Sequence, residues 1–464
     1  MIRNNLPFIC IVAGLTAWVA AGQHDPFLWD SVQLGSKHAH FFYENDLKWA
    51  PLPAGIDSGH PPVFGYYLAV IWSCFGKSLP VSHWAMLPFL AATAWLALRL
   101  GRRLGGAVAA YWLLPVLFLD PVFAGQSTLV APDVVLACCF LLGVEGLLGQ
   151  RKIWVALAVL GLCAISTRGM MTAAALFTWQ ALASRRPDIF FQPGRHAWLA
   201  FVPGVAFAAW FLSWHYFSTG WIGFHAESPW APAFAPAHGW QLLRNAAVIG
   251  WRWTDLGRIF EWLVLAYLLF QPRVAIFRSA LFLLLVCLVL FLTPSALIYN
   301  NLSAHRYFLP LFIGIHLLVY QALTATGLSN RKKIGWFCVL IAGLGTGNCW
   351  IYPRGISMDW DATLAYLPYH RLRANMVEYL DRRQIDFKNV GSDFPNINTG
   401  EILLLNNDLR AFSERDFNRN GYILASNVFN DLTPGDFRLL EQNWQRIRRL
   451  EHAGIWMELY RKRE

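Results

Sequence analysis

The sequence predicts a mainly α-helical fold: a polytopic membrane bundle of about eleven spans, followed by a small C-terminal α+β domain outside the membrane. Composition is the first reason. Of the 464 residues, 56% are hydrophobic and only 14% are charged, whereas soluble domains average about 25% charged residues. The second reason is a series of long apolar segments, and the third is a polar C-terminal segment that begins near Tyr352. An ordinary soluble fold is therefore excluded.

Each predicted span is an apolar segment close to the roughly 20 residues that a helix needs to cross a bilayer. The first one has small residues near its end and is also compatible with a cleaved signal peptide. We favour an anchor, because a protein with many spans needs no separate signal. The spans lie near residues 6–22, 80–98, 107–125, 132–149, 153–167, 170–184, 197–217, 258–271, 279–298, 307–326 and 334–351.

Basic residues set the predicted orientation, since short cytoplasmic loops collect Lys and Arg. Alternate connections carry basic clusters, such as those at 99–103 and 331–333, and Arg3 falls on the same side. The N-terminus is thus expected in the cytoplasm, and an odd number of spans puts the C-terminus outside. The net charge of +10 arises in the membrane part, where it reflects topology and lipid headgroups and does not indicate nucleic-acid binding.

Two long outer loops follow from this topology, residues 23–79 and 218–257. The second loop supplies His225 and Glu227, and both loops contain a predicted amphipathic helix lying on the membrane surface. Because carboxylates and imidazoles gather on the outer side, acid–base or metal-binding chemistry is expected there. In the first loop these groups are Asp30, Glu44, Asp46, Asp57, His38, His40 and His60.

The predicted domain boundary divides a membrane domain, residues 1–351, from an extracytoplasmic domain, residues 352–464. In the second domain, the pattern over 371–383 predicts an amphipathic helix. The segments EILLLNN, YILASNVF and GIWMELYRK predict strands. We expect this domain to pack over the outer face or to shape access to it.

Several short motifs occur in a characteristic order. They are WD, SGHPPVFGYY and FGKSL in the first outer loop, TLVAPDVVLACCFLLG at the fourth span, STRGMM after the fifth and HRYFLPLF at the tenth. With this order and sidedness, residues 1–330 resemble polytopic C-type glycosyltransferases of the protein mannosyltransferase and aminoarabinose transferase superfamily. The resemblance implies an integral protein of a bacterial inner membrane. It also implies inverting transfer of a sugar from a polyprenyl-phosphate donor to a glycan, lipid or protein acceptor on the outer face.

The resemblance also implies roles for individual residues. Asp30 is expected to act as general base, at an interface where partial desolvation raises basicity while access is kept. Arg168 and Arg306 are expected to bind the donor phosphate, whose oxygens suit the guanidinium fork; anchoring in lipid headgroups is the alternative. Tyr307 completes the family's arginine–tyrosine pair. Residues expected to orient the substrates are Asp133, Glu44, Asp57 and His60.

The sequence departs from the family pattern at two places. Ser31 stands where many relatives have a second acid, and His60 with Pro61 replaces an acid and a lysine. His60 and His225 are a candidate pair of ligands for a divalent metal ion, although interfacial histidines more often serve as hydrogen-bonding groups. No cofactor is otherwise required.

Two other classes of membrane protein were weighed. An outer-face glycan ligase or polymerase would share the polytopic form and the lipid-phosphate donor, but would concentrate Arg and His in a late outer loop. A transporter would carry ionisable groups deep within several spans, often in repeated halves. Here Glu145 and Asp120 are the candidates for such groups, and no internal repeat is evident.

Overall fold

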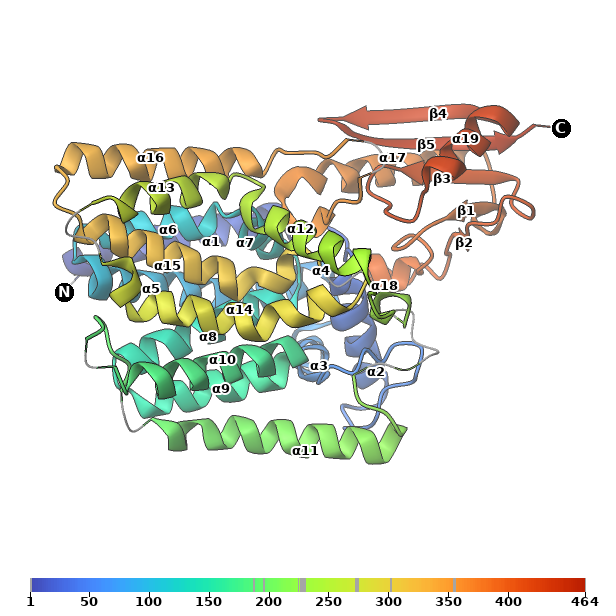
Figure 1. The fold of residues 1–464 in the computed structure, drawn as a ribbon. Helices are drawn as coiled ribbons and strands as arrows, with labels where there is room; N and C mark the ends of the chain where they lie inside the picture. The colour runs from blue at the N-terminus through green and yellow to red at the C-terminus, as the bar shows by residue number, and fades with distance from the viewer. Residues whose placement is uncertain are drawn as a thin grey trace.

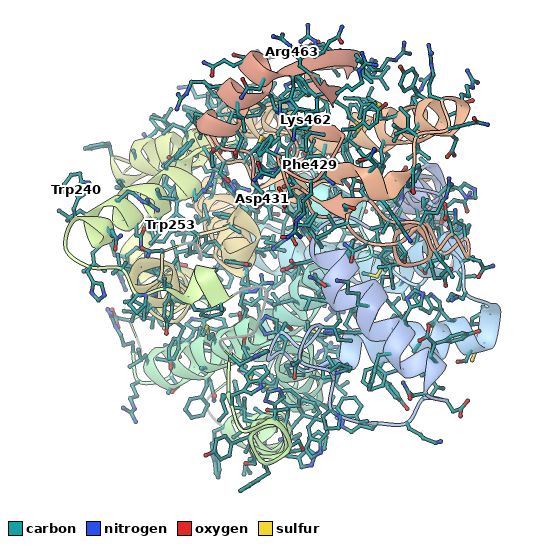
Figure 2. All side chains as sticks on the ribbon, turned by 90° about the vertical axis from the view of Figure 1, so that its right-hand side faces the viewer. Trp240, Trp253, Phe429, Asp431, Lys462 and Arg463 are labelled. Carbon is teal, nitrogen blue, oxygen red and sulfur yellow. The ribbon has the colours of Figure 1, made fainter. Side chains whose placement is uncertain are left out.

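The computed structural model describes residues 2–186, 188–194, 197–223, 225, 231–271, 275–300, 303–353 and 356–463, with residues 2–6 and 232 described by their backbone only. The long helices run side by side, from left to right in Figure 1, with the N-terminus at one end of the bundle and the C-terminal sheet at the other. Figure 2 looks onto the end that carries the sheet, which covers one side of that end.

The helices of the bundle are joined by shorter helices in the connections. These shorter helices are η1 (Ser31–Lys37), α2 (His38–Glu44), α3 (Val63–Phe75), η2 (Trp198–Phe201), η3 (Ala231–Phe234), α12 (Trp240–Thr254), η4 (Ile276–Arg278) and η5 (His305–Phe308). The bundle itself comprises α1 (Ile2–Gly22), α4 (Leu79–Trp84), α5 (Leu87–Gly105), α6 (Ala110–Phe118), α7 (Pro121–Ser127), α8 (Pro132–Leu148), α9 (Lys152–Ile165), α10 (Thr167–Ala183), α11 (Val202–Thr219), α13 (Ile259–Leu269), α14 (Ala280–Ile298), α15 (Leu309–Ala325) and α16 (Asn330–Gly347).

Most predicted spans coincide with helices to within a few residues, but not all are long and apolar enough to cross a membrane. Among the described residues, four helices meet both conditions: Leu79–Gly105, Trp198–Thr219, Ala280–Ile298 and His305–Ala325. The count of about eleven spans therefore stays a prediction.

The predicted span 107–125 is not one continuous helix, because the chain breaks between α6 and α7. Asp120 has non-helical dihedral angles, and its Oδ1 accepts hydrogen bonds from the backbone N–H groups of Val122 and Phe123 at 3.0 and 3.1 Å. The following residue is Pro121, which disfavours helical geometry in the residue before it. An N-cap and a proline therefore start a new helix in the middle of an apolar segment.

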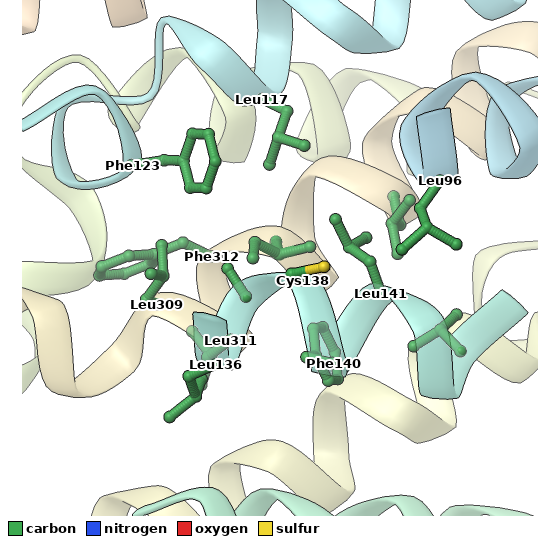
Figure 3. Packing of buried hydrophobic residues seen from close by; sticks show 14 of the residues in the cluster. Leu96, Leu117, Phe123, Leu136, Cys138, Phe140, Leu141, Leu309, Leu311 and Phe312 are labelled. Carbon is green, nitrogen blue, oxygen red and sulfur yellow. The ribbon is translucent and has the colours of Figure 1, made fainter. Parts of the chain in front are cut away.

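The core of the bundle lies around α8 and α15. Leucine and phenylalanine side chains of these two helices, such as Phe140 and Phe312, pack with those of α5, α6 and α7 (Figure 3). In the membrane-crossing segment that contains α15, 89% of the residues are buried, against 28% in the segment that contains α11. α15 is therefore central, and α11 is peripheral.

Charged groups are also buried within the bundle. Glu145 on α8 forms ion pairs with two arginines of α5. Its Oε1 lies 3.0 Å from Nη2 of Arg99 and 2.9 Å from Nη2 of Arg103. The sequence predicted Glu145 and Asp120 as ionisable groups deep in the bundle, but further ionisable side chains are buried with them. Asp120 belongs to a fully buried network with Arg258, Glu261 and His316: Arg258 Nη2 lies 2.7 Å from Asp120 Oδ2, and His316 Nδ1 lies 2.6 Å from Glu261 Oε1.

The C-terminal part folds around a five-stranded sheet with the strand order β2-β1-β3-β5-β4. The contacts of β1 with β2 and β3 are parallel, and those of β5 with β3 and β4 are antiparallel. The elements are η6 (Trp360–Ala362), η7 (Leu364–Tyr366), α17 (Pro368–Arg382), η8 (Phe387–Asn389), β1 (Val390–Ser392), α18 (Gly400–Leu404), β2 (Ser413–Glu414), β3 (Tyr422–Ser426), α19 (Pro434–Asn443), β4 (Trp444–His452) and β5 (Ile455–Lys462).

The predicted helix over 371–383 and the strands in YILASNVF and GIWMELYRK are confirmed as α17, β3 and β5. The predicted strand in EILLLNN is wrong, because this segment forms the short helix α18. Thr399 caps that helix, accepting a hydrogen bond from the backbone N–H of Ile402. Capping thus overrides the strand preference of a short apolar run.

Close packing of α16 depends on two glycines one turn apart. A Cβ atom on Gly347 would lie 2.0 Å from the carbonyl oxygen of Leu256, and one on Gly343 would lie 2.4 Å from the ring of Phe260 and 3.2 Å from the carbonyl oxygen of Gly257. Small residues at this spacing let backbones approach closely in membrane helices. The turn that approaches α16 here connects Asp255 to Arg258, both of which take part in buried ion pairs.

We expect Gly347→Ala to lower the melting temperature of the detergent-purified protein, because overpacking costs about 1–3 kcal/mol. Gly345→Ala is the matched control: it lies on the same helix, and a Cβ atom there meets nothing within 4 Å. The control should melt at the wild-type temperature or slightly above it, since Ala favours helix more than Gly does. Equal melting temperatures for the two variants would contradict this account.

Candidate functional site

Asp30 stands at the start of η1, directly after a residue in a strained conformation. Trp29 has φ 52°, in the left-handed region that bulky residues rarely adopt. The turn is held by Ser31, whose hydroxyl donates to the carbonyl oxygen of Leu28 at 2.6 Å. The Asp30 side chain is 20% exposed, and only its Oδ2 has an ionic partner among the described residues. Its other oxygen remains accessible to a substrate.

The partner of Asp30 is Arg306, in η5. Arg306 Nη2 lies 2.9 Å from Asp30 Oδ2, while Nη1 of the same guanidinium pairs with Asp361 in η6. The Arg306 side chain is 10% exposed. One cation thus joins the first outer loop, the start of α15 and the C-terminal segment.

A second ion pair lies beside the first. Arg168, at the start of α10, donates through Nη1 to Asp133 Oδ1 at 2.8 Å and to the carbonyl oxygen of Arg306 at 3.2 Å. Its guanidinium also lies 4.5 Å from the centre of the Tyr307 ring, a cation–π contact. Among the described residues, Nε and Nη2 of Arg168 have no hydrogen-bond partner, so these donors are free for a ligand.

Asp361 is the site residue that the sequence did not reveal. It is buried, and the segment around it packs on α7: Gln126 Nε2 donates to the Asp361 carbonyl oxygen at 2.9 Å. Burial raises the pKa of its carboxyl to about 6, although Arg306 acts in the opposite direction. The only signal in the sequence was the pair of acids in DWD over 359–361, and nothing in the local sequence connects them to Arg306.

Asp359 extends the same contact to the neighbouring residue. It accepts hydrogen bonds from the backbone N–H and Nδ1 of His305, both at 2.7 Å, while His305 Nε2 lies 2.9 Å from Asp255. Although burial opposes it, Arg252 and His305 hold the pKa of Asp359 well below its usual range. The C-terminal segment thus holds both His305 and Arg306 in place.

Asp57 fastens the first outer loop to α11. Its Oδ2 lies 2.9 Å from His215 Nε2, and its Oδ1 accepts a hydrogen bond from the backbone N–H of Gly59 at 2.9 Å. Both side chains are buried. The structure gives Asp57 a role in holding the loop, and its predicted role in orienting a substrate stays a prediction.

His38 and His40, named from the sequence, also hold the loop. His38 Nε2 lies 2.9 Å from the carbonyl oxygen of Ile56, and His40 Nε2 lies 3.2 Å from Glu401 of α18. Glu401 is paired with Lys77 as well. These contacts connect the first outer loop to the C-terminal part of the chain.

Glu44 does not join the cluster. It is exposed at the end of α2, and no ion pair or hydrogen bond connects it to the site among the described residues. The prediction that it orients a substrate therefore has no support from the fold. The prediction rests on the closeness of Glu44 to Asp30 in the sequence, whereas in the structure η1 and α2 lie between the two residues.

His60 lies next to the cluster. Its Nδ1 is 2.9 Å from the Thr167 hydroxyl, adjacent to Arg168. Burial, reinforced by Arg168, lowers the pKa of His60 to about 3, so that the imidazole is uncharged at neutral pH. It can therefore exchange hydrogen bonds with a substrate but does not contribute positive charge.

The predicted metal site at His60 and His225 has no third ligand among the described residues. No group of three or more His, Cys, Asp or Glu side chains in the described part of the chain is arranged to hold a metal ion. The His225 ring lies 4.6 Å from the Trp221 ring, and His60 already faces Thr167. Glu227, also named from the sequence, lies outside the described residues. A divalent metal ion held by His60 and His225 therefore stays a prediction.

Three carboxylates and two guanidiniums thus meet at the end of the bundle that carries the C-terminal sheet. Asp30 offers a free carboxylate oxygen, and Arg168 offers free N–H donors a short distance away. A carboxylate can accept a proton, and a guanidinium can stabilise an anionic group such as phosphate. The arrangement suits a reaction in which a nucleophile loses a proton while an anionic group departs.

The sequence matches no family model and no curated protein. Among solved structures, ArnT from Cupriavidus metallidurans bound to undecaprenyl phosphate is similar, with a TM-score of 0.52 and 15% identity over 82% of this chain and 73% of that one. ArnT in the apo state has a TM-score of 0.50 and 12% identity over 98% and 97%. At such low identity the likeness shows the fold. The chain has the fold of ArnT, an aminoarabinose transferase of the C-type membrane class, and is an integral membrane protein.

Proposed function

We propose that this protein is a membrane glycosyltransferase that moves a sugar from a polyprenyl-phosphate donor to an acceptor on the outer face of the membrane. The observation that carries the proposal is the pairing of Asp30 with Arg306, next to Arg168 with its free donors. The ArnT fold, solved with undecaprenyl phosphate, supports a donor of this class.

In the proposed reaction, an acceptor hydroxyl or amine attacks the anomeric carbon of the sugar. A new bond forms from the acceptor oxygen or nitrogen to that carbon, and the bond from the carbon to the donor phosphate breaks. Asp30 takes the proton that the acceptor loses, and the polyprenyl phosphate leaves with the bonding electron pair. Attack from the side opposite the phosphate inverts the anomeric configuration.

The two arginines serve the leaving group. Phosphate is already an adequate leaving group, so positioning and neutralisation of its charge are the main tasks of the protein. Arg168 can donate to the phosphate through Nε and Nη2, and its guanidinium packs over the ring of Tyr307. Arg306 holds Asp30 through one oxygen and leaves the other for the proton.

An apolar groove supports a lipid-linked donor. It has a volume of about 690 Å³ and is lined by apolar side chains of α9, α10, α11 and α14. At one end lies Met170, two residues from Arg168, and further along lie Phe177 and Trp198. A prenyl chain in this groove would keep its phosphate beside Arg168.

The proposed orientation places the site outside the cell's cytoplasm. The basic connection between α15 and α16 lies at the end of the bundle far from the C-terminal sheet (Figure 1). Short basic connections favour the cytoplasmic side, which leaves the sheet and the Asp30 cluster on the outer side. A glycan, a lipid or a protein can each reach a site there.

The buried network of Asp120, Arg258, Glu261 and His316 does not favour a transporter. Each of these four charged groups is paired with another member, and all are fully buried. A transported solute would need an unpaired group that faces a cavity. We assign this network to holding α7, α13 and α15 together.

We expect Asp30→Asn to lower kcat for sugar transfer by about 10²–10⁴-fold, because the base is removed, with binding of the lipid donor retained. Asp46→Asn is the matched control, an exposed acid of the same loop. Purified proteins would be incubated with a panel of polyprenyl-phosphate sugars, and the lipid and acceptor fractions analysed by mass spectrometry. Full transfer by Asp30→Asn would refute the assignment of the base.

Asp361→Asn should reduce kcat/KM by about 10–100-fold, since a contact of a hydrogen-bonding group with a charge is worth about 1.5–3 kcal/mol. Without its second anchor, Arg306 is free to turn away from Asp30. Asp361→Glu should restore part of the activity, and Asp386→Asn, an exposed acid of the same domain, should have no effect. A loss of folded protein without any change in kcat/KM would show a merely structural role.

Ala174→Trp should raise the KM for long-chain polyprenyl donors, because the indole fills the groove. Donors with a short prenyl chain should be affected less. Leu157→Trp is the control, since this α9 residue is exposed and lies outside the groove. The steady-state kinetics would be measured against donors of two chain lengths. An equal change in KM for both lengths would contradict the groove assignment.

A further inference from the structure

A second cavity lies away from the Asp30 cluster, where the chain leaving α1 meets the C-terminal part. It has a volume of about 500 Å³. One wall is a face of α17, and the opposite wall includes Pro26 and Leu404. None of the residues that line it belongs to the cluster of Asp30, Asp133, Arg168, Arg306 and Asp361. The cavity therefore has a different lining from the proposed catalytic site.

His370 is a buried polar group that lines this cavity. Its side chain is buried, at 8% exposure, and neither ring nitrogen has a hydrogen-bond partner among the described residues. The rings of Tyr366 and Tyr369 pack against it. Burial lowers the pKa of His370 to about 3, so the imidazole is neutral and carries one N–H donor. Buried polar groups without partners are rare, and each calls for an explanation such as a bound ligand.

Arg373 lies one turn further along the same face and also lines the cavity. It is buried to the same extent, and its only hydrogen bond among the described residues goes from Nε to Asn396 Oδ1 at 2.6 Å. No carboxylate pairs with it there. A buried guanidinium is normally paired, because leaving the charge uncompensated costs several kcal/mol, about 3–5 when a partner is removed. Its two Nη groups are therefore available for an anion.

Glu378 and Asp381 also line the cavity, and Asp408 acts on Arg373 without forming an ion pair with it. Glu378 pairs with Arg382, and Asp381 lies 2.6 Å from Arg410. Asp408 is also held by Arg410, at 2.9 Å. Arg373 is thus the charged residue of the lining that has no ion-pair partner among the described residues, and the neutral imidazole of His370 lies beside it.

We propose that this cavity binds the phosphate of an anionic lipid headgroup at the outer surface of the membrane. Arg373 would pair with the phosphate, and His370 would donate a hydrogen bond to it. A lipid is favoured over a free phosphate ion because Pro26 follows the end of α1 by four residues, which places the cavity where that helix leaves the membrane. The apolar walls formed by Val377 and Leu404 suit the glycerol and acyl start of the lipid.

Bound lipid would hold α17 against the membrane domain. α17 follows the segment that contains Asp359 and Asp361, so the headgroup would stabilise the position of those acids on His305 and Arg306. The binding itself does not depend on sugar transfer. A protein that lacked transferase activity would still bind the lipid.

The test uses the full-length protein, delipidated in detergent, with dioctanoyl phosphatidylglycerol as the probe and native mass spectrometry as the readout. We expect one bound lipid per chain, with affinity at least tenfold weaker in Arg373→Gln. Ala374→Trp fills the cavity and leaves the guanidinium in place, and it should weaken lipid binding to the same extent. This second variant tests the proposal even if Arg373→Gln fails to fold. Arg371→Gln is the matched control, an exposed arginine of the same helix.

Absence of a bound lipid in the wild type, or equal binding by Ala374→Trp and the wild type, would overturn the proposal. Inorganic phosphate is the second probe: if it binds as tightly as the lipid and displaces it, the site is one for free phosphate and the lipid assignment is wrong. Asp30→Asn should bind the lipid as the wild type does, which separates this site from the proposed transferase reaction.

Discussion

The ion pairs of Arg306 are the interaction on which the end of the bundle that carries the C-terminal sheet depends. Its guanidinium is mostly buried and is shared between Asp30 of the first outer loop and Asp361 of the C-terminal segment. In such surroundings a charge is tolerated only when it is paired, and removing one partner is far more costly than at a solvated surface. Three segments distant in sequence are therefore fixed relative to one another by a single side chain, and the carboxylate of Asp30 acquires a defined direction.

Further pairs continue this arrangement toward the interior of the bundle. His305 lies between Asp359 and Asp255, and a short turn connects Asp255 to Arg258 of the fully buried network. This turn packs closely against α16 because Gly343 and Gly347 have no side chains. These ion pairs form a series from η5 to the buried network. Each pair compensates the charge of its partner, and together they connect η5, α7, α13 and the C-terminal segment.

The sequence predicted the helices and the residues at their ends, but it did not reveal contacts between residues that are far apart in the chain. The lengths of the apolar segments predicted most helices, and the alternation of basic connections predicted that five residues lie at the same end of the bundle. These residues, which do come together, are Asp30, Asp133, Arg168, Arg306 and Tyr307. Asp361 could not be predicted: its partner is 55 residues away, and the polar C-terminal segment contains many other acids with equal local claims. Glu44 and Asp57 illustrate the converse, since closeness in sequence to Asp30 did not bring them to the cluster. The Asp-Pro pair at 120–121 is a signal for the start of a new helix. It was missed because the residues on both sides are apolar and suggest one continuous helix.

The peripheral place of α11 has a consequence for how the donor is supplied. Because the groove beside α11 is apolar and lies on the side of the bundle, a lipid would enter it by sideways diffusion within the bilayer, and its chain would stay in hydrocarbon throughout. Only the phosphate and sugar would move between the surface and the protein. The occupancy of the groove would then follow the mole fraction of donor in the membrane, not its concentration per volume of solution. Dilution with inert lipid would slow such an enzyme even when the total amounts of protein and donor are unchanged.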